Sequence, residues 1–382
     1  MLERFHVPEN EEVRVKPENL KKTSEKIFVK CGMSMDHAVI ATDVLLKADI
    51  RGVDTHGVSN MLRNYVKYLS EGSAKAKPDW KIVRETASCA TVDCDAGLGL
   101  VIAPLCMDIA IEKAKKTGVG LVSMGNGRHL GMAAYHAMKA LEHDMIGTCM
   151  TSCSPRMVPT FSSKAAVGTN PISYAAPAGK LPPFVFDAAM TSVAGNKITL
   201  ASRLGVPLEG GWISDDKGNP IMEEVNLSKL NQYEDDSKNL ESRYELGGYK
   251  SVNAVNLLPF GGTREIGSHK GYSMAMVVDI LGGILNGTKT APTGEFTGHG
   301  HFVAAYSIDA FMDVAEFKNV MDSYLQSFLD LPSNSEGKKV VYAGYIEHLE
   351  QEKRVSKGIP LHMEVVNWFK DVCKKLDIDS IK

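Results

Sequence analysis

The sequence lacks the apolar runs that a membrane-spanning helix requires. Its longest nearly apolar stretches, residues 97–111 and 271–285, are interrupted by Asp108 and Asp279. Both are shorter than the roughly 20 residues needed to cross a bilayer. The first residues are polar and charged, without the apolar segment of a secretory signal. We therefore expect neither a membrane protein nor a secreted one.

Paired cysteines and an excess of charge are missing too. The seven cysteines are scattered singly, with no Cys-x-x-Cys pair, which favours reduced thiols in the cytoplasm. The formal net charge is −3, so no basic surface points to nucleic acid or an anionic membrane. His299 and His301 have no third ligand nearby in sequence, so we expect no metal. Hydrophobic residues make up 44% of the chain, enough for a large folded core.

The N-terminal part of the chain has the pattern of a helical unit. Apolar residues recur at helical spacing three times in this part, the last time after Gly57. Near the other end of the chain, residues 363–376 are amphipathic. We expect residues 1–78 to form a helical segment on which residues 355–382 pack.

From Trp80 onward, strand patterns and helix patterns alternate, which predicts an α/β cofactor-binding and substrate region over residues 79–354. Residues 222–249 carry many charges and few large apolar side chains, so we expect an exposed insertion there, followed by a buried helix at 271–285. The expected strands are 90–93, 119–124 and 146–151, and the expected helices between them are 104–116 and 132–143.

A glycine pair resembles a dinucleotide-binding turn but fails in detail. Gly97 and Gly99 follow a predicted strand and precede a helix. Ile102 occupies the third position, where such a turn needs Gly or Ala for helix packing. The next strand, 119–124, ends without the acidic residue that holds a ribose hydroxyl. The pattern argues against a Rossmann fold.

The segment Asp54-Thr55-His56-Gly57 is a candidate for proton transfer. A helix beginning near Gly57 places His56 at its N-terminus, where backbone N–H groups attract anions. An imidazole beside a hydroxyl and a carboxylate exchanges protons near neutral pH. Asn60 and Arg63 follow on the same predicted face. The alternative is that Asp54 or Thr55 caps the helix and His56 only packs; taken alone, the segment favours this alternative.

Further segments combine glycines with polar side chains near predicted helix starts. His129 lies in a glycine-rich turn, and Thr169 in a Gly-Thr-Asn-Pro loop. Asp187 ends a strand before a run of small residues that reaches Lys197. The segment 268–271, Ser-His-Lys-Gly, begins a helix. Each has a plain alternative as a turn or a helix cap.

Taken together, these segments resemble the malate/L-lactate dehydrogenase family, which is unrelated to the Rossmann-type lactate and malate dehydrogenases. The family includes sulfolactate and ureidoglycolate dehydrogenases, diketogulonate reductase and piperideine-carboxylate reductases. Each segment is weak alone, but their joint order is specific and covers nearly the whole chain. The matching segments are 54–57, 93–99, 129–131, 168–171, 187–198, 270–271, 300–302 and 358–361.

The resemblance implies a homodimer with an α/β fold. The cofactor domain is expected to be a three-layer mixed sheet of the L-sulfolactate dehydrogenase-like type, with a helical domain from the N- and C-terminal segments. The implied activity is hydride transfer between a nicotinamide cofactor, NAD or alternatively NADP, and C2 of a small 2-hydroxy or 2-oxo acid of the malate, lactate or sulfolactate type. The alternatives are ureidoglycolate oxidation, reduction of a cyclic imine such as piperideine carboxylate, and a non-catalytic cofactor-binding protein.

The resemblance also implies roles for individual residues. His56 is the expected acid/base, and Thr55 stands where the family usually has Ser. Lys197 and His129 are expected beside the reacting atoms, and Thr169 beside the substrate. The residues expected at the cofactor are His129, Asp187, Ala188, Ala189, Met190, Thr191, Ser192, Val193, His269, Lys270 and Gly271.

The chain departs from the family pattern next to His56. Asn60 and Asn64 stand where the family commonly has Arg and Tyr, and Arg63 and Tyr65 lie alongside. We expect Arg63, together with Asn60, to bind the substrate carboxylate, because a guanidinium suits a carboxylate through two parallel hydrogen bonds.

Overall fold

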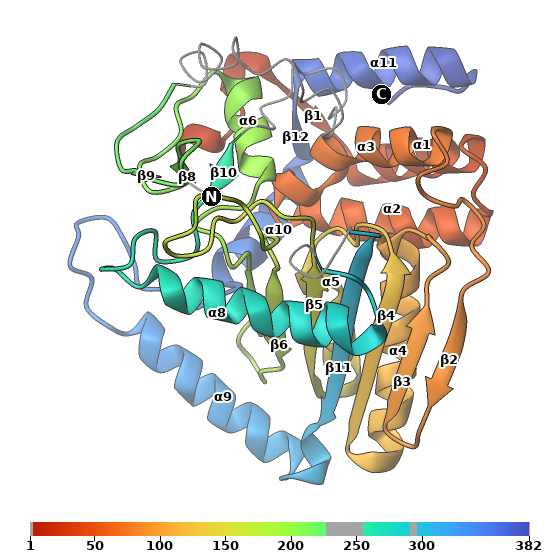
Figure 1. Ribbon diagram of the computed structural model, residues 1–382, viewed down its shortest axis with the longest axis vertical. Helices are drawn as coiled ribbons and strands as arrows, with labels where there is room; N and C mark the ends of the chain where they lie inside the picture. Colours follow the sequence, from red (N-terminus) through yellow and green to blue (C-terminus); the bar gives the residue numbers. More distant parts are fainter. Residues whose placement is uncertain (1–2, 227–254, 291–295, 382) are drawn as a thin grey trace.

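The protein is built around a mixed sheet with helices on both faces (Figure 1). The computed structural model describes residues 3–226, 255–290 and 296–381. Within these residues the sheet has seven strands, and only β3 and β4 run parallel. This topology confirms the mixed α/β fold and differs from a parallel Rossmann sheet. The strand order is β2 (Lys81–Glu85), β3 (Cys89–Asp93), β4 (Val119–Gly127), β11 (His299–Ser307), β5 (Met145–Ser152), β6 (Ile172–Ala176) and β7 (Phe184–Ala188).

Helices of different character cover the two faces of the sheet. The first face carries α4 (Gly99–Thr117) and α5 (Ala133–Met138), which contact the central strands. Helix α4 is apolar on most of its sides, and Leu100, Ile102 and Met107 are fully buried. The opposite face carries α8 (Ser268–Val278) and the π-turn η6 (Asp279–Gly283).

The two ends of the described chain meet in the helical layer above the sheet. Helices α1 (Pro17–Lys30), α2 (Met35–Ile50) and α3 (Val58–Ser70) pack together. Strand β12 (Ile359–His362) pairs antiparallel with β1 (Glu12–Val15), and α11 (Met363–Leu376) lies on α1 (Figure 1). Helix α10 (Tyr345–Lys357) packs on α2. One apolar core runs from the helical layer into the sheet, so the division at residues 78 and 79 stays a prediction.

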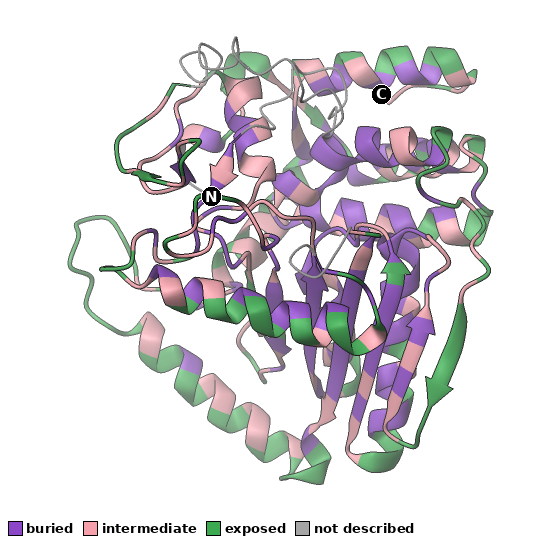
Figure 2. Ribbon diagram, in the orientation of Figure 1, coloured by how far each residue is buried: buried purple, intermediate pink, exposed green. Residues whose placement is uncertain are grey.

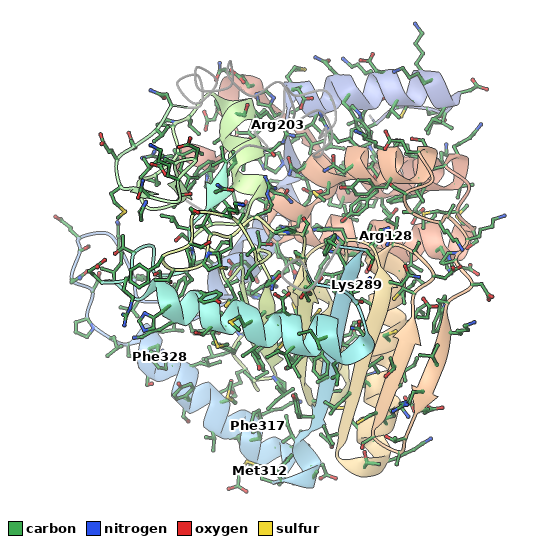
Figure 3. All side chains as sticks on the ribbon, viewed as in Figure 1. Arg128, Arg203, Lys289, Met312, Phe317 and Phe328 are labelled. Atoms are coloured by element: carbon green, nitrogen blue, oxygen red, sulfur yellow. The ribbon has the colours of Figure 1, made fainter. Side chains whose placement is uncertain are left out.

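A smaller unit and an outlying helix complete the described chain. Helix α6 (Asn196–Leu204) packs with a small sheet of β10 (Asn256–Leu257), β8 (Ile213–Ser214) and β9 (Pro220–Ile221) around a separate core. Helix α9 (Val314–Leu329) buries only Leu325; its side chains at Phe317 and Phe328 are labelled in Figure 3. Short 3-10 turns lie at Glu3–Phe5, Glu9–Glu11, Asp54–His56 (η3), Lys139–His143, Ile284–Asn286 and Ile308–Ala310.

Most elements expected from periodicity are present, with one clear error. Strands β3, β4 and β5 and helices α3, α4 and α11 confirm the predicted segments, and residues 132–143 form α5 followed by a 3-10 turn. The helix expected at 271–285 is present as α8, η6 and a 3-10 turn, but the expectation that it is buried is wrong: only its inner side covers the sheet, and the outer side is exposed (Figure 2). The exposed apolar residues there are Met274, Met276, Val277, Ile280, Ile284 and Leu285.

The insertion expected at 222–249 lies mostly outside the described residues. None of the helices in the described part of the chain combines the length and the apolar character that crossing a bilayer requires.

Candidate functional site

A cavity of about 730 Å³ lies between the helical layer, the ends of the central strands and the start of α6. This volume falls within the range of small-molecule sites. Its wall includes turn η3, one side of α3, the connection from β4 to α5, the end of β7 and the residues around the start of α10. Of the residues expected to act in catalysis or in binding, those that line it are Thr55, His56, His129, Thr169, Asp187, Ala189 and Lys197.

Turn η3 is shaped by a buried carboxyl group beneath it. Asp49, at the end of α2, accepts hydrogen bonds from the Ser59 hydroxyl (2.7 Å) and from the Ser59 backbone N–H (3.3 Å). The cap of α3 therefore comes from Asp49, and not from Asp54 or Thr55 as the simple alternative had it. A Cβ on Gly57 would lie 2.0 Å from Asp49 Oδ1. This close packing explains why glycine follows His56.

His56 is held at the cavity wall by its neighbours. Its Nδ1 lies 2.9 Å from Thr55 Oγ1. The amides of Asn60 and Asn196 both donate to the Thr55 carbonyl, at 3.1 and 2.9 Å, which fixes the turn. Burial lowers the pKa of His56 to about 4. The imidazole is therefore neutral at neutral pH and is able to accept a proton.

His129 lies beside His56, and its contacts suit it to donate a hydrogen bond rather than to accept a proton. The two rings are stacked with centroids 5.9 Å apart. The backbone N–H of Gly131 donates to His129 Nδ1 at 3.1 Å, and Tyr65 Oη lies 2.6 Å from the same nitrogen. Because Nδ1 accepts, the ring proton sits on Nε2. Burial and the neighbouring imidazoles lower the pKa of His129, so His129 is a neutral hydrogen-bond donor.

One end of the cavity carries cations. Lys197 Nζ lies 5.6 Å from the ring centre of Phe5 and 6.0 Å from that of Trp212, and burial lowers the pKa of Lys197. Arg156 lines the same region, and a Cβ on Gly195 would lie 3.1 Å from its Nη1. The sequence analysis missed Arg156, although its place four residues after β5 was a usable signal.

Another part of the wall carries a guanidinium with two carboxyl groups. Arg51 is 5% exposed and donates to the Gly344 carbonyl at 3.5 Å. Asp187 is exposed to the cavity, yet its Oδ2 accepts the Ala134 N–H at 2.7 Å. Burial among the surrounding protein atoms raises its pKa to about 7, and the nearby Glu347 adds to the rise. Arg51 and Glu347 were missed because no local motif marks them.

The expected carboxylate-binding pair, Arg63 and Asn60, does not line this cavity. Both guanidinium arms of Arg63 are bound to Glu364 of α11, at 2.7 and 3.0 Å. Arg203 of α6 (Figure 3) lies 3.2 Å from the same carboxylate and donates to Asn60 Oδ1 at 3.0 Å. Arg63 therefore does not lie where we expected it, because Glu364 of α11 binds its guanidinium on the other side of α3 from the cavity.

Several residues expected at the cofactor also lie outside the cavity wall. Ala188 pairs with Ile172 in the sheet, and His269 Nδ1 lies 3.0 Å from Arg264 Nη1. Their roles, like those of the others, stay predictions. The other residues expected at the cofactor that do not line the cavity are Met190, Thr191, Ser192, Val193, Lys270 and Gly271.

The cavity combines two neutral imidazoles side by side with cations at one end. The family model described as malate/L-lactate dehydrogenase matches residues 15–370. The chain belongs to this family. It is therefore an oxidoreductase of hydroxy acids.

Individual relatives match over nearly full length. The chain is 32% identical to a malate dehydrogenase of Pyrococcus abyssi, with 100% of both chains covered. It is 33% identical to an L-sulfolactate dehydrogenase of Methanocaldococcus jannaschii, covering 96% of this chain and 98% of that one. The solved malate dehydrogenase of Pyrococcus horikoshii has a TM-score of 0.83 at 30% identity, covering 98% and 99%.

Proposed function

We propose that the protein transfers a hydride between a nicotinamide cofactor, NAD in preference to NADP, and C2 of a small 2-hydroxy or 2-oxo acid of the malate, lactate or sulfolactate type. The observation that carries this proposal is the pairing of His56 with Thr55 Oγ1 at 2.9 Å, beside the neutral donor His129. The similarity to enzymes named malate dehydrogenase and L-sulfolactate dehydrogenase supports it.

The cavity fits the proposed cofactor in size and in the groups that it presents. Its volume of about 730 Å³ suits a large ligand. Asp187 and Glu347 offer acceptors for ribose hydroxyls, Arg51 offers a donor for phosphate, and Ala189 leaves room beside Asp187. When bound there, the cofactor supplies or takes the hydride.

His56 exchanges the proton that accompanies the hydride. In the direction of oxidation, its neutral imidazole takes the proton of the substrate hydroxyl; in reduction, it returns a proton to the same oxygen. Thr55 Oγ1 orients the ring through Nδ1. His129 donates a hydrogen bond through Nε2, which suits the carbonyl oxygen of the oxo acid.

The cationic end of the cavity binds the substrate carboxylate. Arg156 presents a planar guanidinium that holds a carboxylate by two parallel hydrogen bonds. Lys197 adds a second positive charge in the same wall, and Thr169 adds a hydroxyl. Two cations favour a substrate with two anionic groups over one with a single carboxylate.

The test is turnover of purified protein with NADH and NADPH, followed by absorbance, against oxaloacetate, sulfopyruvate, pyruvate and piperideine-2-carboxylate. We expect oxidation of NADH with a dianionic oxo acid. The variant His56→Ala should lower kcat by about 10²–10⁴-fold, the range for a lost acid/base. The surface variant His348→Ala is the matched control and should keep full activity.

Other outcomes would contradict this proposal in different ways. Turnover with piperideine-2-carboxylate alone would favour cyclic-imine reduction. Cofactor binding without turnover across the panel would favour a non-catalytic binding protein. Full activity of His56→Ala would remove the acid/base role of His56.

We also propose a homodimer and a cytoplasmic location. A second copy of the chain is a suitable partner for the exposed apolar side of α8 and the turns after it, because contiguous apolar patches of this kind mark protein interfaces. The seven unpaired cysteines support a reducing compartment.

A further inference from the structure

A buried arginine from the far end of the chain holds the turn that carries His56. Arg354 lies on α10, and its side chain is 5% exposed. Its Nη1 donates to the Asp49 carbonyl at 2.7 Å and to Asp54 Oδ1, and its Nη2 donates to Asp54 Oδ2 at 3.2 Å. Glu350, one helical turn earlier, accepts from Arg354 Nε at 2.7 Å. The guanidinium therefore joins the end of α2 to the first residue of turn η3.

Glycine at position 52 allows α10 to approach this closely. Gly52 has a φ of +75°, a conformation that L side chains rarely adopt. A Cβ there would also lie 2.8 Å from Glu350 Cγ and 3.7 Å from Arg354 Nη2. The segment before His56 is thus shaped from outside by α10 and from beneath by Asp49.

The same helix reaches the cavity at its other end. Gly344, Ile346 and Glu347, at the start of α10, line the cavity wall. Arg354 follows Glu347 by two helical turns and lies behind the His56 turn. Helix α10 therefore contacts the region proposed for the cofactor and also supports the group proposed for proton transfer.

We propose that Arg354 is a positioning residue for His56, acting through the carboxylate of Asp54. The inference rests on the proposed acid/base role of His56. The guanidinium fixes Asp54, which begins the turn, and neutralises its charge two residues before the imidazole. Arg354 itself does not line the cavity.

Removing the guanidinium has two consequences that a purely structural arginine lacks. The His56 ring loses its fixed place, and a misplacement of about 1 Å in an active site lowers turnover about 10²-fold. Asp54 also becomes an unpaired carboxylate near His56, which stabilises the imidazolium and raises the pKa of His56. The other ionisable groups around His56 are Asp49 behind it and His129, His299, Lys197 and Arg156 in the cavity wall. Burial raises the pKa of Asp49 to about 7 and Arg354 opposes that rise, so Asp49 stays protonated to higher pH in Arg354→Gln, and the charge that the variant uncovers is that of Asp54.

The experiment compares Arg354→Gln, Asp54→Asn/Arg354→Gln and His56→Ala in steady-state kinetics over a range of pH. Lys113→Gln is the matched control, because Lys113 is also buried and bound to Glu85 at 2.9 Å and to the Thr86 carbonyl at 2.7 Å, away from the cavity. The fraction of folded protein is measured by circular dichroism, and all rates are expressed per folded enzyme.

We expect Arg354→Gln to lower kcat about 10²-fold, with a smaller change in KM for the cofactor. Its acidic limb of kcat/KM for hydroxy-acid oxidation should move to higher pH. The double variant should return that limb to its original place without restoring kcat. Should Arg354→Gln fail to fold, Arg354→Lys keeps the charge without the planar fork, and we expect a reduced kcat with an unmoved acidic limb.

The results separate this inference from the proposed function. An active His56→Ala enzyme would overturn both. An inactive His56→Ala enzyme together with Arg354→Gln kinetics like those of Lys113→Gln, or an unmoved acidic limb in Arg354→Gln, would overturn the positioning role alone. With Arg354→Lys as the only folded variant, full kcat would overturn it.

Discussion

Replacing Gly57 by Ala tests how tightly the His56 turn is packed. The backbone of Gly57 is extended, with φ −84° and ψ −179°, so alanine adopts it without strain. The added methyl group would meet Asp49, with distances of 2.0 Å to Oδ1, 2.2 Å to Cγ and 2.6 Å to Oδ2. Ordinary contact begins near 3.4 Å, so either the turn or the carboxyl group has to move by about 1.4 Å.

The expected magnitude follows from that displacement. Overpacking of this kind costs about 1–3 kcal/mol, and weakening the hydrogen bonds from Ser59 to Asp49 adds about 1 kcal/mol. We therefore expect the free energy of unfolding to fall by about 2–4 kcal/mol. A shift above 1 Å next to His56 should also lower kcat about 10²-fold.

Urea denaturation and steady-state kinetics measure the two effects. Gly72→Ala is the control, because Gly72 has a φ of +73° with nothing within 4 Å of a Cβ; it should lose about 1–2 kcal/mol through backbone strain alone and keep its kcat. In Asp49→Ala/Gly57→Ala the clash is gone, so the double variant should lose less stability than the sum of the single variants. Additive losses, or a Gly57→Ala enzyme with wild-type kcat, would refute the packing argument.

Two further predictions concern pH and assembly. The proposed role of His56 requires a neutral imidazole for hydroxy-acid oxidation. Because burial lowers the pKa of His56 to about 4, kcat/KM for oxidation should rise with pH through about 4 and stay level across neutral pH. A midpoint near the ordinary 6.5 of histidine would show a well-solvated ring instead. Met276→Glu/Ile280→Glu places charges on the exposed side of α8 and η6 and should halve the mass in light scattering to the 41.5 kDa of one chain, whereas Val83→Glu on the edge strand β2 should not; an unchanged mass in the first variant would exclude this face.

The sequence predicted those site residues whose structural surroundings are formed by their own neighbours along the chain. His56 and His129 each lie in a turn bounded by glycine, and both reach the cavity because such turns join the helices and strands that form its wall. The family resemblance added their order along the chain. Strands β3, β4 and β5 were predictable for a similar reason, since each carries a short apolar run between turn residues.

The residues that were not predicted, or were predicted in the wrong place, depend on contacts between segments far apart in the sequence. Arg63 was expected at the substrate because helical spacing placed it near His56, but its partner Glu364 is 301 residues away. Arg51 and Glu347 interact electrostatically although they share no sequence motif. The exposure of α8 depends on which of its sides faces the sheet, and apolar residues lie on both sides of the segment 271–285, so its sequence gives little signal for that choice.

The pairing of Asp54 with Arg354 also sets an order of events during synthesis. The two residues are 300 positions apart, so at about 5–20 residues per second the ribosome needs roughly 15–60 s to produce the second after the first. Until then the Asp49 carbonyl and the Asp54 carboxylate lack the guanidinium that binds them, and β1 lacks its partner strand β12. A nascent chain that ends before α10 therefore lacks both the guanidinium that binds Asp54 and the strand that pairs with β1.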